Sequence, residues 1–145
     1  MSVLEDIKEA WSWVGLEPKR VVAMNEFGNL LIEDARGRYW RLCPEDVYCK
    51  VVAESNEAYE SLLKNYEFTS DWEMVELVRK ARAKLGPLPE GHRFCLKIPA
   101  LLGGTYDVAN IGTAPLHELV LFSGDLARKT KDLPEGTPIQ LRVVD

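Results

Sequence analysis

The sequence of 145 residues predicts an α+β protein. Near the N-terminus, short β candidates are joined by tight turns, and connections this short force neighbouring strands to run antiparallel. Further along, predicted helices and strands do not alternate as they would in a parallel sheet. We therefore expect an N-terminal helix, an antiparallel β-meander, two central helices and a strand–helix–strand segment, packed as one domain.

The N-terminal helix is predicted over residues 3–14. Ser2 and Glu5 have the spacing of a capping box, in which the two residues exchange side-chain to backbone hydrogen bonds. Apolar residues then recur at helical spacing, and Gly15 suits the residue that follows a helix.

The meander is predicted from four short β candidates. They cover residues 20–24, 30–33, 39–42 and 47–52. The separating segments contain Gly or Pro together with Asn or Asp, which favour tight reversals of the chain. They cover residues 25–29, 34–37 and 43–46.

The two central helices are expected over residues 54–64 and after a second capping box at residues 70–73. The second of these helices should end at Gly86, which Pro87 follows. We place the boundary between an N-terminal region, 1–53, and a C-terminal region, 54–145, just before the first of them.

The predicted C-terminal region continues with a strand over residues 93–98, which Pro99 ends. Gly103 and Gly104 indicate a turn or a close approach of two backbone segments. Pro115 is expected at the first position of the last helix. Alternating apolar residues over 139–144 predict a closing strand.

Composition excludes several classes of protein. Hydrophobic residues make up 46% and charged residues 28% of the chain, and no window holds the roughly 18 apolar residues of a membrane span. The first residues lack the basic and apolar regions of a signal peptide. Three unclustered cysteines fit a reducing cytosol, and a net charge of −5 disfavours direct nucleic-acid binding. We expect a cytoplasmic monomer or weak homodimer with no membrane partner.

Metal binding is the main chemical alternative. Two cysteines flank a predicted hairpin turn and an H-x2-C pair follows later, so four ligands could in principle satisfy tetrahedral zinc: Cys43, Cys49, His92 and Cys95. However, there is no C-x2-C motif, and free cysteine is commonly a small buried hydrophobe. No local signature supports a Cys/His nucleophile or paired catalytic carboxylates. We therefore predict no catalytic residue and no cofactor, and keep a small zinc protein or enzyme as the alternative.

Charge is distributed unevenly along the chain. Residues 54–78 carry seven acids and one base, whereas residues 79–97 carry six bases and one acid. Aligned carboxylates accelerate encounters with a cationic protein, and aromatic side chains next to charge are frequent interface anchors. We expect the partner to bind acids within this block: Glu57, Glu60, Glu67, Asp71 and Glu73. Tyr106 and Asp107, next to the two glycines, are the second candidate surface.

The ordered residues also resemble a known family. The segment from Phe94 to Ile111 is similar to the aromatic-x-x-K-x-P-x-x-L-G-G-x-Y-x-x-x-N-I stretch in the C-terminal domain of bacterial type VI secretion immunity proteins. Residues 116–119 and 132–139 also fit that domain. Upstream, residues 25–31 and 37–42 are similar to the strand–turn–strand module called GAD-like.

The resemblance implies a protein that binds and neutralises a cognate toxin inside the producing cell. Several toxins of this kind are nucleases, whose clefts for nucleic acid are basic, so an acidic inhibitor could cover such a cleft. The resemblance implies no catalysis and no cofactor, and it leaves the docking surface open. A scaffold with no toxin partner is the third possibility.

Overall fold

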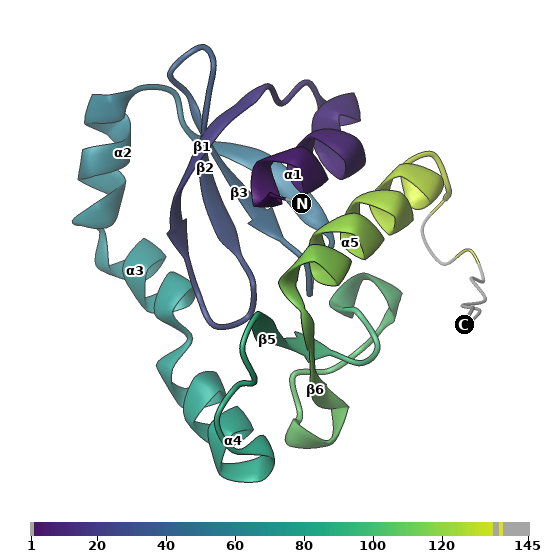
Figure 1. Cartoon of the computed structure of the whole chain (residues 1–145). Helices are drawn as coiled ribbons and strands as arrows, with labels where there is room; N and C mark the ends of the chain where they lie inside the picture. The colour runs from purple at the N-terminus through teal and green to yellow at the C-terminus, as the bar shows by residue number, and fades with distance from the viewer. Residues whose placement is uncertain (1, 135–136, 138–145) are drawn as a thin grey trace.

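The computed structural model describes residues 2–134 and residue 137. It confirms the α+β class and the predicted meander (Figure 1). A single sheet with the order β1-β2-β3-β4 contains only antiparallel pairs. Its strands are β1 (Pro18–Met24), β2 (Leu30–Asp34), β3 (Tyr39–Cys43) and β4 (Tyr48–Ala53).

The N-terminal helix forms as the sequence predicted. α1 (Val3–Trp11) is followed by the 3-10 turn η1 (Ser12–Val14). The Ser2 side chain accepts a hydrogen bond from the Glu5 backbone amide at 3.2 Å, which satisfies one of the free amides at the start of the helix. Gly15 ends the helical segment with a φ of 94°, a left-handed conformation that glycine adopts without steric penalty.

The prediction of two central helices is wrong in one respect, because this region forms three. They are α2 (Asn56–Leu63), α3 (Tyr66–Glu73) and α4 (Val75–Leu85). Ser70, predicted as a helix cap, lies inside α3, whose true cap is the Asn65 side chain accepting from the Phe68 amide at 3.1 Å. Met74 separates α3 from α4 with a φ of 49°.

The remaining elements include a strand that was not predicted. β5 (His92–Leu96) pairs antiparallel with β6 (Ile111–Pro115), and two 3-10 turns, η2 (Ala100–Leu102) and η3 (Val108–Asn110), lie between them. Pro115 therefore ends β6 and caps α5 (Leu116–Thr130). The prediction that Pro115 is the first residue of this helix is wrong by one position, because the helix begins at Leu116. The predicted strand over residues 139–144 lies outside the described residues.

The two adjacent glycines were expected to mark a turn or a close approach of two backbone segments, and the structure shows one of each. Gly103 has a φ of 90° and ends η2. Gly104 has its Cα against the backbone carbonyl of Ile98, so that an added Cβ would overlap that carbonyl. Both glycines are therefore required by the backbone, one for its conformation and the other for space.

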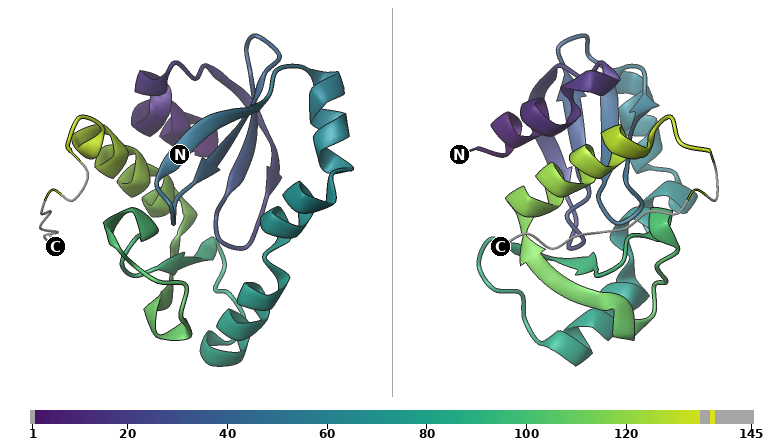
Figure 2. Two further views of the ribbon diagram at one scale, coloured as in Figure 1. Left: turned by 180° about the vertical axis from the view of Figure 1, so that it is seen from behind. Right: turned by 90° about the vertical axis from the view of Figure 1, so that its right-hand side faces the viewer.

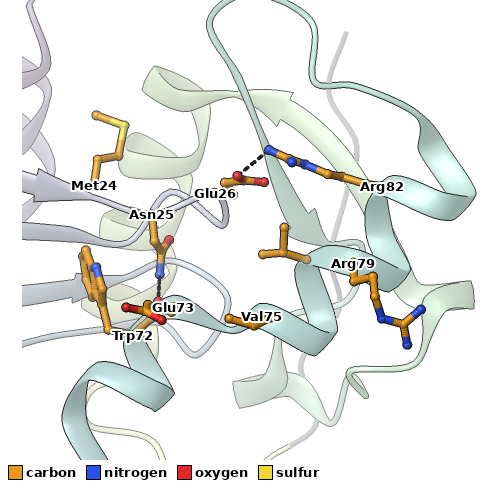
Figure 3. Close-up of a pocket in the computed structure, with 9 residues that line it drawn as sticks. Met24, Asn25, Glu26, Trp72, Glu73, Val75, Arg79 and Arg82 are labelled. Atoms are coloured by element: carbon orange, nitrogen blue, oxygen red, sulfur yellow. Dashed lines mark hydrogen bonds and ion pairs between the residues drawn. The ribbon is translucent and has the colours of Figure 1, made fainter. Parts of the chain in front are cut away.

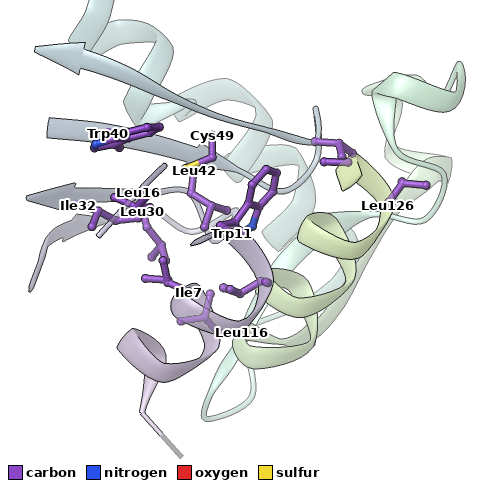
Figure 4. Close-up of a cluster of buried hydrophobic side chains, with 14 residues drawn as sticks. Ile7, Trp11, Leu16, Leu30, Ile32, Trp40, Leu42, Cys49, Leu116 and Leu126 are labelled. Atoms are coloured by element: carbon purple, nitrogen blue, oxygen red, sulfur yellow. The ribbon is translucent and has the colours of Figure 1, made fainter. Parts of the chain in front are cut away.

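Helices cover both faces of the sheet (Figures 1 and 2). On one face, α1 and α5 lie over the main hydrophobic core, in which Trp11, Leu42 and Val120 are almost fully buried (Figure 4). On the other face, Tyr59 of α2 stacks on Tyr39 of β3. The sheet is thus the middle layer of three, and α2 and α3 form an outer layer.

A second, smaller core joins α4 to the β5–β6 pair. It contains Phe27, Ala81, Phe94, Leu96 and Ile111. The first of these residues comes from the loop between β1 and β2, so this loop connects the sheet to the second core. The predicted boundary between residues 53 and 54 stays a prediction. No helix among the described residues is long and apolar enough to cross a membrane.

Candidate partner-binding surface

The structure brings the five predicted acids together on two consecutive helices. Glu57 and Glu60 lie on α2, and the other three lie on α3, and all five residues are exposed. Every residue of α2 and α3 keeps part of its surface in solvent. We name the exposed face of α2 and α3 the acidic surface. It also displays two exposed hydrophobic side chains, Leu63 and Tyr66, the latter 81% exposed.

The acids of this surface are not equivalent. Asp71 forms an ion pair of 2.6 Å with Arg41 of β3. Within the described chain, the other four predicted acids form no ion pair: Glu57, Glu60, Glu67 and Glu73. These four carboxylates therefore keep their negative charge available to a partner, whereas Asp71 is already engaged by the sheet.

Arg41 fastens α3 to the sheet. Its side chain is only 5% exposed, and its guanidinium lies 5.3 Å from the Trp72 ring and 6.0 Å from the Phe68 ring. Its Nε donates to the Asn29 side-chain oxygen at 3.1 Å. A buried guanidinium is tolerated when it is paired with an opposite charge and hydrogen-bonded. The Asp71 carboxylate of α3 provides that charge, and the Phe68 and Trp72 rings of the same helix add cation–π contacts. Sequence reasoning missed this residue because a single arginine in a strand carries no signal of burial.

An equivalent contact fastens α2. The rings of Tyr39 and Tyr59 are parallel, with centroids 4.1 Å apart. The Tyr39 hydroxyl donates to the Asn56 side-chain oxygen at 3.1 Å and lies 3.3 Å from Glu33. The acidic surface is therefore held to the sheet by aromatic and polar contacts from α2 and by the Arg41–Asp71 ion pair from α3.

A groove opens at the end of the acidic surface, between the loop after β1 and the junction of α3 with α4 (Figure 3). Its volume is about 610 Å³, and Glu73 lines it together with Trp72 and Val75. Asn25 donates to the Trp72 backbone carbonyl at 2.9 Å, which ties the two walls together. This groove could not be predicted from the sequence, because residues distant along the chain form it.

Tyr106 and Asp107 lie on a different segment, between η2 and η3. The preceding turn η2 is attached to the turn between β3 and β4, where the Ala100 amide donates to the Glu45 carbonyl at 2.8 Å. Burial, and then the charges of Glu45 and Cys43, raise the pKa of Tyr106. The Asp107 carboxylate accepts from the Thr105 hydroxyl at 3.1 Å, so this acid is engaged within its own loop.

Glu45 is a buried carboxylate beside this turn. It is 3% exposed, and its Oε1 accepts from the Asn29 amide at 2.7 Å and from the Cys43 thiol at 3.1 Å. Its Oε2 is buried and has no hydrogen-bond partner among the described residues. Burial raises the pKa of Glu45, and the hydrogen bonds from Cys43 and Asn29 oppose that shift only in part.

The four proposed zinc ligands do not converge. Cys49 belongs to the core under α1 and α5, and it pairs with Leu42, so Cys43 points to the opposite face of the sheet. His92 and Cys95, three residues apart on β5, also point to opposite faces. Among the described residues, no group of three or more His, Cys, Asp or Glu side chains could hold a metal ion. The structure therefore contradicts the four-ligand alternative.

A comparison with protein-family models identifies the family of this chain. Residues 53–127, just over half of the chain, match the model of the family described as T6SS immunity protein Tdi1, C-terminal. The matched segment begins with the last residue of β4 and includes the whole acidic surface and the groove's α3–α4 wall. Among curated proteins, no sequence matches the chain. The GAD-like resemblance of the preceding region stays a prediction. The chain belongs to the T6SS immunity protein Tdi1 C-terminal family.

Proposed function

We propose that this protein binds and neutralises a cognate toxin of a type VI secretion system in the cytoplasm of the producing cell. The observation that carries the proposal is the family match over residues 53–127. It supports an inhibitor that acts by binding and performs no catalysis. The toxin is a protein, and the inhibitor requires no cofactor, nucleic acid or membrane for this role.

The acidic surface is the proposed docking site for the toxin. Four of its carboxylates form no ion pair within the described residues, and their summed field would attract a cationic protein over several ångströms. Tyr66, which is 81% exposed, supplies an aromatic contact beside these charges. A basic partner fits this combination better than a neutral one.

A nuclease toxin would present such a basic surface, because its cleft must neutralise phosphates. We propose that the four unpaired carboxylates take the place of phosphates at that cleft. Inhibition would then consist of steric and electrostatic exclusion of the nucleic acid. Tyr106 and Asp107 would form a secondary contact, since they lie on a separate loop between η2 and η3.

The test uses the purified chain and a catalytically inactivated toxin, to be sought among the proteins encoded next to the gene of this chain. We expect a stable complex by size-exclusion chromatography and calorimetry, formed by a monomer or weak homodimer of this chain. The active toxin should lose its activity when the chain is added in stoichiometric amount. Failure to form a complex, or full toxin activity in the complex, would contradict the proposal.

A further inference from the structure

Helix α3 carries three of the five predicted acids, yet apolar packing holds it only weakly. None of its eight residues is buried. Among the described residues, neither hydrophobic core includes a residue of α3. A surface helix is normally positioned by an apolar face that packs on a core. Because α3 has no side chain in either core, its position depends on directional polar and aromatic contacts.

Two polar contacts from the sheet layer reach the C-terminal half of α3. Arg41 Nη1 donates to the Asp71 carboxylate at 2.6 Å. Asn25 Nδ2 donates to the adjacent backbone carbonyl, that of Trp72, at 2.9 Å (Figure 3). One contact holds a side chain of α3 and the other holds its backbone, so together they restrict both the tilt and the rotation of the helix.

Both contacts depend on Asn29, which is fully buried. Its side-chain oxygen accepts from Arg41 Nε at 3.1 Å, and its backbone amide donates to Asn25 Oδ1 at 2.9 Å. Its Nδ2 donates to the buried Glu45 carboxylate at 2.7 Å. These four buried residues therefore form one connected network. Hydrogen bonds in a low-dielectric interior are strong, so the network fixes the orientations of the Asn25 and Arg41 side chains.

The turn between β1 and β2 holds the two asparagines in place. The Asn25 amide donates to the Asn29 carbonyl at 3.1 Å, and Asn25 Oδ1 also accepts from the Phe27 amide at 3.0 Å. Phe27 is 1% exposed and belongs to the second core. The sequence predicted this segment only as a tight reversal, but its anchored position also makes it a rigid support for α3.

We propose that Asn25 and Asn29 are positioning residues that hold α3 in the orientation required by the toxin, an inference that rests on the proposed function and deepens it. A surface that is fixed before binding loses less conformational entropy in the complex. Both side chains are uncharged, so they contribute nothing to the attraction of a basic toxin over distance. Their loss should therefore shorten the lifetime of the complex without slowing its formation.

The first arm of the test requires no toxin and follows amide hydrogen exchange by NMR. Asn25→Ser and Asn29→Ser each shorten the side chain and remove its amide donor without changing the net charge. The control Val120→Ala weakens the main core, on the opposite face of the sheet. We expect α3 amides to exchange about tenfold or more faster in each asparagine variant and at the wild-type rate in the control, because exchange from an exposed helix reports its local opening. Unchanged α3 exchange in the asparagine variants overturns the inference.

A double-mutant cycle separates positioning from a general loss of stability. In the Asp71→Ala background, Asn29→Ser should accelerate α3 exchange by less than about threefold, because Arg41 then has no carboxylate on α3 to hold. Equal acceleration with and without Asp71 would contradict an action of Asn29 through Arg41. If Asn29→Ser does not fold, Asn25→Ser decides the test, since its serine oxygen can still accept a hydrogen bond within the turn.

The second arm measures the rates of association and dissociation with the inactivated toxin. We expect both asparagine variants to dissociate about fivefold or more faster and to associate within about twofold of the wild-type rate, and the control to keep both rates. Unchanged dissociation of variants whose α3 exchange is accelerated overturns the inference while the proposed function stands. Failure of the wild-type chain to bind toxin overturns the proposed function instead, and the exchange arm then still reports whether the asparagines hold α3.

Discussion

Arg41 on β3 donates to the Asp71 carboxylate on α3 across 2.6 Å, and the two side chains are 5% and 70% exposed. The sequence predicted Asp71 as a partner-binding residue. The structure gives it another role, because its carboxylate is the charged partner of a buried arginine. A substitution at Asp71 therefore changes how α3 is held to the sheet as well as the charge of the acidic surface.

Asp71→Ala should destabilise the fold more than removal of an unpaired acid nearby. The variant leaves the Arg41 guanidinium with Asn29 and two aromatic rings but without its carboxylate. Because Asp71 is largely exposed, we expect a loss of about 1–2 kcal/mol in the free energy of unfolding. The control Glu73→Ala, on the same helix, should stay within about 0.5 kcal/mol of wild type. Urea unfolding measures both, and equal stabilities would contradict the role assigned to the pair.

The adjacent glycines provide a second test of the fold. Gly104→Ala should cost about 2–3 kcal/mol, because the new Cβ would overlap the Ile98 carbonyl and force the backbone apart. Gly103→Ala has open space around its Cβ, so only its φ of 90° opposes the change, at about 1 kcal/mol. Thermal unfolding of the two variants checks the order. A Gly104→Ala protein as stable as wild type would rule out the close approach.

Glu45 predicts a pH dependence of stability. Its pKa is raised in the folded protein, so the folded state favours the protonated form. Its contribution to stability is fully present below the ordinary value of 4.5 and is lost as pH rises through the folded pKa. The stability of wild type relative to Glu45→Gln should therefore fall as pH rises from 4.5 towards neutrality. Urea unfolding at several pH values measures the difference, and a constant difference would contradict the assignment.

Much of the fold could be predicted because its signals are local. Ser2 and Gly15 specify the ends of the first helix through their own backbone geometry, and Gly- and Asx-containing turns specify the meander. Met74 shows the opposite case. A methionine carries no helix-breaking signal, so the left-handed residue that separates α3 from α4 could not be predicted, and Ser70 was mistaken for a cap.

The candidate site was predictable only as a set of charges. The acidic residues were visible in the sequence, and the structure places them on two consecutive helices. Which acid is paired depends on Arg41, thirty positions away in the chain, and only the folded sheet shows that contact. The groove likewise depends on the loop at Asn25 meeting Trp72, a long-range contact without a local motif.

The central claim is that four unpaired acids attract a basic toxin. One variant changes the four unpaired acids to lysine and leaves Asp71 intact: Glu57→Lys, Glu60→Lys, Glu67→Lys and Glu73→Lys. Its matched control changes four exposed acids elsewhere to lysine: Glu9, Glu17, Glu90 and Asp132. Both variants undergo the same change in net charge, so any difference between them reports the location of the charges. Thermal unfolding first establishes that both are folded.

The most direct measurement is the rate of association with the inactivated toxin as a function of ionic strength. We expect the acidic-surface variant to associate about tenfold or more slowly than the control at low salt. The gap should narrow towards physiological salt, where the Debye length is about 8 Å. Equal association rates of the two variants at low salt would contradict the claim and place the toxin away from α2 and α3.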